Sequence, residues 1–196
     1  TVIKQLALMG HNLLMLYTED TYEIEGEPYF GYMRGRYTIK ELNLLDEYAA
    51  GFGISMIPCI QTLAHLNAAV NWRVYKDLTD IEDVLLIDDE KTYEFIEKAI
   101  SSCRKAFHSN RIHIGMDEAH LVGRGKYLDL HGNVDKTDLL LRHLDRVYEI
   151  CQKYGFRPML WGDMFFRVAN NGEYYMRGSD YSKLRKCVDG SMDLVY

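Results

Sequence analysis

The sequence has 196 residues and is poor in cysteine and proline. Its four cysteines lie far apart and form no C-x-x-C pair, which argues against a disulfide framework and favours free thiols. No apolar run approaches the ~20 residues that a membrane helix needs. Asp and Glu (29) outnumber Lys and Arg (23), giving a net charge of −6. This acidic balance argues against nucleic acid or a membrane surface as the partner.

Other common signals are absent as well. No low-complexity tract or linker divides the chain, so we expect residues 1–196 to form one domain. The absence of Asn-x-Ser/Thr acceptor sites and of a disulfide pattern favours a cytoplasmic protein. The chain begins Thr1-Val2-Ile3, without Met, and ends in the strand-like Leu194-Val195-Tyr196. We therefore expect a chain incomplete at both ends, in which a missing signal peptide decides nothing about localisation.

Segments with helical periodicity alternate with short apolar segments along the whole chain. The pattern predicts helices at 1–10, 39–50, 91–107, 138–154 and 181–187, and strands at 13–17, 54–58, 111–115, 156–161 and 192–196. Thr38 and Glu41 predict a capping box at the start of the second helix. Such alternation is typical of a parallel sheet, either doubly wound or closed into a barrel. Because no Gly-rich phosphate loop follows a strand, we prefer a partial (β/α)8 TIM barrel of about five to six β/α units.

Polar residues gather after the predicted strands, whereas the turns after the helices are short. The segments that follow the strands contain Thr18-Glu19-Asp20, Gln61 to His65, Asp117-Glu118 and Trp161-Gly162-Asp163. Active sites of TIM barrels lie at the carboxyl ends of the strands. The pattern therefore predicts a site at this edge of the sheet.

Asp117 and Glu118 form the most informative pair in the sequence. Adjacent side chains of an extended segment point to opposite sides, so we expect the two carboxylates to take different roles. The usual pair of glycosidase carboxylates lies across the scissile bond, which a dipeptide serves poorly. The pair better suits a reaction in which one carboxylate protonates the leaving oxygen and the other holds a group on the sugar. The plainer alternative is a charged loop start that binds Arg124 or Lys126.

Four motifs resemble those of family 20 glycoside hydrolases, the β-N-acetylhexosaminidases. HIGMDE (113–118) resembles the His-x-Gly-Gly-Asp-Glu signature of the family. NLLMLYTED (12–20), IPCIQTLAH (57–65) and MLWGD (159–163) are similar to its second strand, its third strand and a later Trp-bearing strand. The motifs follow the family's order, so residues 1–196 are identified as a partial glycoside hydrolase catalytic domain.

The resemblance implies substrate-assisted, retaining hydrolysis of terminal N-acetyl-β-D-hexosamines (GlcNAc or GalNAc) in glycans, without a cofactor or metal. Glu118 would be the general acid and base, and Asp117 would orient the acetamido group. His65 would hydrogen-bond near Glu118, with Asp20 behind it. Trp161 would form a wall of the acetamide pocket, and Asp163 would reach a sugar hydroxyl. A homodimer is compatible with this assignment.

Parts of the family pattern are changed or missing here. Met116 replaces the second Gly of the signature, next to the catalytic pair. The family's sugar-clamping Arg would lie before residue 1, and its acetamide-binding Tyr beyond residue 196. Trp72 lies in a predicted long loop (67–90) that could overhang the site, although a surface or interface role is equally compatible.

Two alternatives to a hexosaminidase stay open from the sequence. His113, Asp117, Glu118 and His120 offer metal ligands within eight residues, as a TIM-barrel metallohydrolase could use, although their spacing fits no zinc signature. The chain could also be a carbohydrate-binding barrel fragment without catalysis. The intact Asp117-Glu118 pair argues against that reading, whereas an incomplete barrel argues for it.

Overall fold

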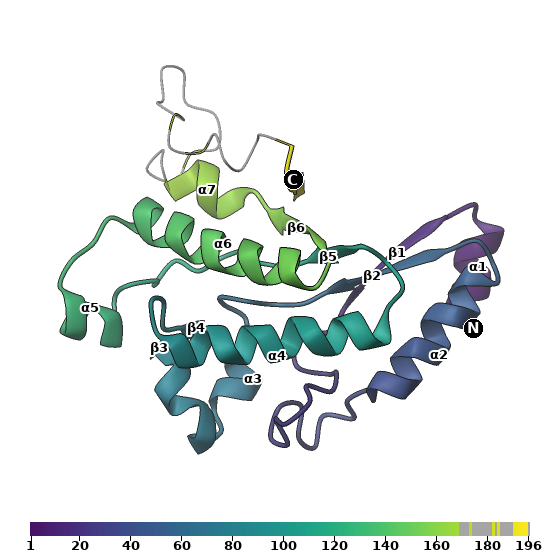
Figure 1. Ribbon diagram of the computed structural model, residues 1–196, viewed down its shortest axis with the longest axis horizontal. Helices are drawn as coiled ribbons and strands as arrows, with labels where there is room; N and C mark the ends of the chain where they lie inside the picture. The colour runs from purple at the N-terminus through teal and green to yellow at the C-terminus, as the bar shows by residue number, and fades with distance from the viewer. Residues whose placement is uncertain (169–172, 174–181, 183, 185–189, 196) are drawn as a thin grey trace.

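The computed structural model describes residues 1–168, 173, 182, 184 and 190–195, and its centre is a parallel sheet of five strands (Figure 1). The strands are β1 (Leu13–Tyr17), β2 (Ser55–Cys59), β5 (Arg111–His113), β6 (Arg157–Trp161) and β7 (Asp193–Val195). They lie side by side in chain order. A doubly wound sheet reverses its order at a switch point, whereas a barrel adds strands sequentially. The observed order confirms the five predicted strands and fits a partial barrel.

The long helices α2 (Ile39–Ala50), α4 (Glu90–Ala106) and α6 (Lys136–Lys153) connect these strands and pack side by side against the sheet (Figure 1). The shorter α1 (Val2–Leu8) precedes β1. The capping box of α2 is confirmed: Thr38 Oγ1 accepts from the Glu41 N–H (3.1 Å), and Glu41 Oε2 accepts from the Thr38 N–H (2.8 Å). The predicted helix 181–187 lies largely outside the described residues.

The prediction of a long loop at 67–90 is wrong. The segment contains α3 (Asn67–Val70), the 3-10 helix η1 (Arg73–Leu78) and a hairpin of β3 (Thr79–Ile81) and β4 (Val84–Leu85). Asp80 is buried and accepts backbone N–H bonds from Gly123 (2.8 Å) and Tyr127 (2.7 Å), which joins the hairpin to the loop after β5. Trp72 is partly buried and packs against Tyr29 and Tyr32, so it does not project over the site as a free loop residue.

The remaining described helices flank the carboxyl edge of the sheet. They are α5 (Lys126–His131), after β5, and α7 (Asp163–Val168), which begins directly after β6. Cys59, Cys103 and Cys151 are buried free thiols, as predicted, and Cys187 lies outside the described residues. Within the described part of the chain, no helix is both long and apolar enough to span a membrane.

Candidate active site

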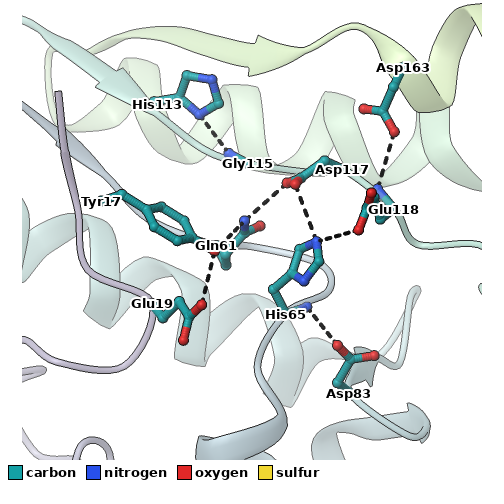
Figure 2. A network of polar contacts seen from close by, with 10 residues as sticks. All are labelled: Tyr17, Glu19, Gln61, His65, Asp83, His113, Gly115, Asp117, Glu118 and Asp163. Carbon is teal, nitrogen blue, oxygen red and sulfur yellow. Dashed lines mark hydrogen bonds and ion pairs between the residues drawn. The ribbon is translucent and has the colours of Figure 1, made fainter.

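The segment that follows β2 is held in place by buried hydrogen bonds. Thr62 Oγ1 donates to the Ile114 carbonyl (2.8 Å), and the Thr62 carbonyl lies 3.0 Å from Nε2 of the buried His143 on α6. His65 has a left-handed backbone (φ 58°), and its N–H donates to Asp83 (3.0 Å). Left-handed conformations cost energy in residues other than Gly, so these contacts fix a strained backbone. The imidazole of His65 is thereby directed to the loop after β5 (Figure 2).

Asp117 and Glu118 both face that imidazole. His65 Nε2 lies 3.2 Å from Asp117 Oδ2 and 3.6 Å from Glu118 Oε2, which are ion-pair distances rather than aligned hydrogen bonds (Figure 2). The expectation that the two side chains point to opposite sides is therefore wrong. The physical reason is that β5 ends at His113, and both Met116 (φ 69°) and Glu118 (φ 50°) leave the extended conformation.

The surroundings of the two carboxylates differ. The side chain of Asp117 is 22% exposed, and its Oδ1 accepts a hydrogen bond from Gln61 Nε2 (3.0 Å). The side chain of Glu118 is 64% exposed. Gln61 was not among the predicted site residues, because a glutamine after a strand carries no sequence signal beyond its place in the third-strand motif. One carboxylate is thus held from within the protein, while the other faces the opening.

Trp161 and Asp163 lie beside the pair, as predicted. A pocket of about 260 Å³ is lined by Asp117, Glu118, Trp161, Gly162, Asp163, Arg167 and Val195. Asp163 Oδ2 accepts the N–H of Glu118 (3.2 Å). Burial raises the pKa of Asp163, and the neighbouring charge of Asp117 adds to this effect. Asp163 therefore holds the backbone of Glu118 as well as lining the pocket.

A comparison with models of known protein families identifies the family of this chain. The model of the family described as glycosyl hydrolase family 20, catalytic domain, matches residues 11–182. The chain belongs to this family.

Solved structures of family 20 enzymes share the fold of this chain. An exo-β-N-acetylglucosaminidase from Vibrio harveyi in complex with N-acetylglucosamine has a TM-score of 0.74 at 19% identity, covering 98% of this chain and 37% of that one. A β-N-acetylhexosaminidase from Streptomyces coelicolor A3(2) has a TM-score of 0.72 at 18% identity (99% and 43%). One from Bacteroides fragilis NCTC 9343 has a TM-score of 0.72 at 20% identity (100% and 45%). The chain spans less than half the length of each of these structures, and the predicted partial TIM barrel is confirmed.

The predicted place of Asp20 behind His65 is wrong for this family 20 domain. The side chain of Asp20 is 3% exposed, and its Oδ1 accepts from Arg34 Nε (3.2 Å). Arg34 also lies 3.8 Å from Glu19. Among the described residues other than Asp117 and Glu118, the carboxylate bound to His65 is that of Asp83, which accepts the backbone N–H. Asp20 is therefore a buried partner of Arg34 in the loop after β1.

The four-residue metal set is also wrong. Within the described ranges, no three His, Cys, Asp or Glu side chains gather as ligands. The side chain of His113 is buried, its Nδ1 accepts the Gly115 N–H (3.1 Å), and its ring packs 4.7 Å from that of Trp161. Burial lowers the pKa of His113 to about 4, so the ring is neutral near neutral pH. His120 is exposed and separate from this packing. The buried, neutral ring of His113 therefore has a structural role.

Proposed function

We propose that this domain hydrolyses terminal N-acetyl-β-D-hexosamine residues of glycans by a substrate-assisted, retaining mechanism. The observation that carries the proposal is the convergence of Asp117 and Glu118 on His65 in a family 20 fold, beside a pocket walled by Trp161. Residues 1–196 would then be one partial catalytic domain of a longer enzyme. The solved Vibrio harveyi relative, which holds N-acetylglucosamine, supports this class of substrate.

Glu118 is the proposed general acid and base. Its carboxyl group is the more exposed of the two, and its N–H is anchored on Asp163, so the side chain is presented at the mouth of the pocket. In the first step the Glu118 carboxylic acid gives its proton to the glycosidic oxygen as the bond to the anomeric carbon breaks. In the second step its carboxylate takes a proton from the water that attacks that carbon. His65, whose Nε2 lies 3.6 Å from Glu118 Oε2, would influence the proton affinity of the Glu118 carboxyl group.

Asp117 is the proposed partner of the acetamido group. The carbonyl oxygen of that group would attack the anomeric carbon, and positive charge would develop on the resulting oxazolinium ring. The Asp117 carboxylate, held by Gln61 and His65, would accept the acetamide N–H and stabilise this charge. Trp161 would then form the apolar wall against the acetamide methyl group, and Asp163 would complete the polar side of the pocket.

The test uses the full-length protein with an aryl N-acetyl-β-glucosaminide and, in parallel, the matching aryl β-glucoside. We expect release of the aryl alcohol from the acetamido sugar only, with the β-anomer as the first-formed sugar in a proton NMR time course. Equal rates on both substrates would rule out assistance by the acetamido group, because the plain glucoside lacks the internal nucleophile. An α-anomer formed first would rule out retention.

A further inference from the structure

Gln61 lies at the centre of the polar network around Asp117. It lies two residues after the end of β2 and is 4% exposed. Its Nε2 donates to Asp117 Oδ1 (3.0 Å) and to the Tyr17 hydroxyl (3.3 Å) (Figure 2). A carboxylate only accepts hydrogen bonds, so the atom that faces Asp117 must be the amide nitrogen. The Tyr17 hydroxyl in turn donates to Glu19 (3.4 Å). Both amide hydrogens of Gln61 are therefore assigned, and one of them is fixed on the proposed catalytic pair.

The Gln61 amide packs against Gly115, where the absence of a side chain leaves room for it. A Cβ on Gly115 would lie 2.1 Å from Gln61 Oε1 and 3.0 Å from the Ile60 carbonyl, and Gly115 has a left-handed φ of 72°. Gln61 Oε1 is buried and, among the described side-chain atoms, is one of those without a hydrogen-bond partner. An unpaired buried acceptor is costly. The amide keeps this orientation although its oxygen is unpaired, because its nitrogen is committed to Asp117 and Tyr17.

Each oxygen of Asp117 has one contact on the protein side, and only the contact to Oδ1 is a hydrogen bond. Gln61 binds Oδ1, and His65 lies against Oδ2. The first contact comes from a neutral amide, which adds no charge beside the carboxylate. We propose that Gln61 is a positioning residue that acts through Asp117, holding its carboxylate in the orientation that receives the acetamide N–H; this inference rests on the proposed function. The amide is suited to this task because an acidic residue at the same place would repel Asp117.

The test compares Gln61→Ala and Gln61→Glu with Ser102→Ala in the full-length protein. Gln61→Ala removes the hold on Asp117, and we expect kcat on an aryl N-acetyl-β-glucosaminide to fall about 10- to 100-fold, since small misplacements of reacting groups have costs of this size. Ser102 on α4 is the control: it is buried, and its hydroxyl accepts the Glu25 N–H (3.0 Å) rather than binding Asp117. Ser102→Ala should lower stability while kcat per folded molecule stays within about twofold of wild type.

Gln61→Glu adds a readout that a purely structural residue would not change. The introduced carboxyl group would face Asp117 at hydrogen-bond distance, and two such carboxyls share one proton. We expect the variant to recover activity as pH falls, because the protonated carboxyl can again donate to Asp117, and to lose it as pH rises.

Other titratable groups lie near Asp117 and could also contribute to the dependence of kcat on pH. Burial raises the pKa of Cys59 to about 12 and lowers that of His113 to about 4, and burial also raises that of Tyr17. These three groups therefore stay uncharged near neutral pH. His65, Glu118 and Asp163 also face the site, and they are present in the wild type and in every variant. The ratio of variant to wild-type kcat at each pH therefore isolates the introduced carboxyl.

The outcomes separate the two proposals. No hydrolysis by the wild type would overturn the proposed function. Hydrolysis by the wild type with kcat of Gln61→Ala within twofold would overturn the role of Gln61 alone. So would a Gln61→Glu profile parallel to that of the wild type, since a residue that only fills space would give no new pH dependence. A loss in Gln61→Ala that persists unchanged in an Asp117→Asn background would show that Gln61 does not act through Asp117.

Discussion

Two Asp–His pairs lie at opposite ends of the sheet, and they are built differently. At the amino end, Asp46 of α2 accepts the His108 N–H (2.9 Å) with the same oxygen that lies 2.6 Å from His108 Nδ1. The Asp46 side chain is 6% exposed, and the pair joins α2 to the turn before β5. At the carboxyl end, Asp117 lies 3.2 Å from His65 without an aligned hydrogen bond and is 22% exposed. In the first pair one buried Asp oxygen makes both contacts to its His, whereas in the second the more exposed Asp lies against its His without a hydrogen bond.

The backbone shows the same contrast. The described residues other than Gly with a positive φ all lie in segments that follow strands: Glu19, Met33, His65, Glu82, Asp88, Met116 and Glu118. The helix-to-strand turns of the described residues reach this conformation only at glycines, such as Gly53 and Gly155. Left-handed residues other than Gly cost of order 1–3 kcal/mol each and gather at functional sites. The contrast teaches that one edge of the sheet is built for stability and the other bears strain for the site.

The largest effect that tests this contrast is expected for Glu118→Gln. The amide keeps the shape of the side chain but cannot give a proton, so kcat on an aryl glucosaminide with a poor leaving group should fall about 100- to 10,000-fold. A dinitrophenyl aglycone needs little protonation, and the loss with that substrate should be clearly smaller. An equal loss with both aglycones would contradict the role of general acid. Thermal unfolding should change little, because this side chain is 64% exposed.

The next prediction compares the same substitution in the two pairs. Asp117→Asn should lower kcat about 100- to 1,000-fold, because the developing charge loses its stabilising carboxylate, with little change in stability. Asp46→Asn should do the reverse: it weakens two contacts of a buried carboxylate and should lower the free energy of unfolding by about 1–3 kcal/mol. Denaturant titrations and steady-state kinetics on both variants check this. The contrast between the two ends fails if Asp46→Asn lowers kcat per folded molecule as much as Asp117→Asn does.

A third, smaller effect is expected where the backbone supports the site. Gly115→Ala would place a methyl group against the Gln61 amide and strain a left-handed residue. We expect kcat to fall about 10-fold, since a displacement of the amide would carry Asp117 with it. Gly53→Ala at the other edge meets the same positive φ but no atom within 4 Å, so it should lower stability without lowering kcat. Similar kcat values for the two variants would show that strain at the site edge has no special consequence.

The sequence predicts those features that depend on local patterns. Helix α2 was predicted to the residue, because Thr38 and Glu41 cap it through contacts three residues apart. The hairpin of β3 and β4 was missed, since strands of three and two residues are too short to show a periodicity.

The sequence predicted which residues form the site better than it predicted which of them contact one another. The motifs predicted Asp117, Glu118 and His65, which the fold brings together. The pairing of Asp20 with Arg34 and the contact of Gln61 with Asp117 span 14 and 56 residues, and no local pattern determines which distant partner a polar side chain meets. The convergence of the two carboxylates was likewise missed, because it depends on left-handed backbone conformations that residues other than Gly rarely adopt.

The last predicted effect concerns stability alone, at a histidine that belongs to neither pair. His143 is fully buried behind the site, with Nε2 on the Thr62 carbonyl and Nδ1 3.4 Å from the Tyr93 hydroxyl. Burial lowers its pKa to about 4, below the ~6.5 of an unfolded chain, so the unfolded state binds the additional proton. The stability that this residue contributes is complete above about pH 6.5 and is lost as the pH falls toward 4.

His143→Gln, whose amide can still donate to the Thr62 carbonyl, tests this. Between pH 7.5 and pH 5, the variant should lose about 2 kcal/mol less of its free energy of unfolding than the wild type, as measured by denaturant titration. His113 titrates in the same direction in both proteins, so the difference between them reports His143 alone. An identical loss in the two proteins would mean that the acid sensitivity lies in the strained edge of the sheet and not in the buried histidine that supports it.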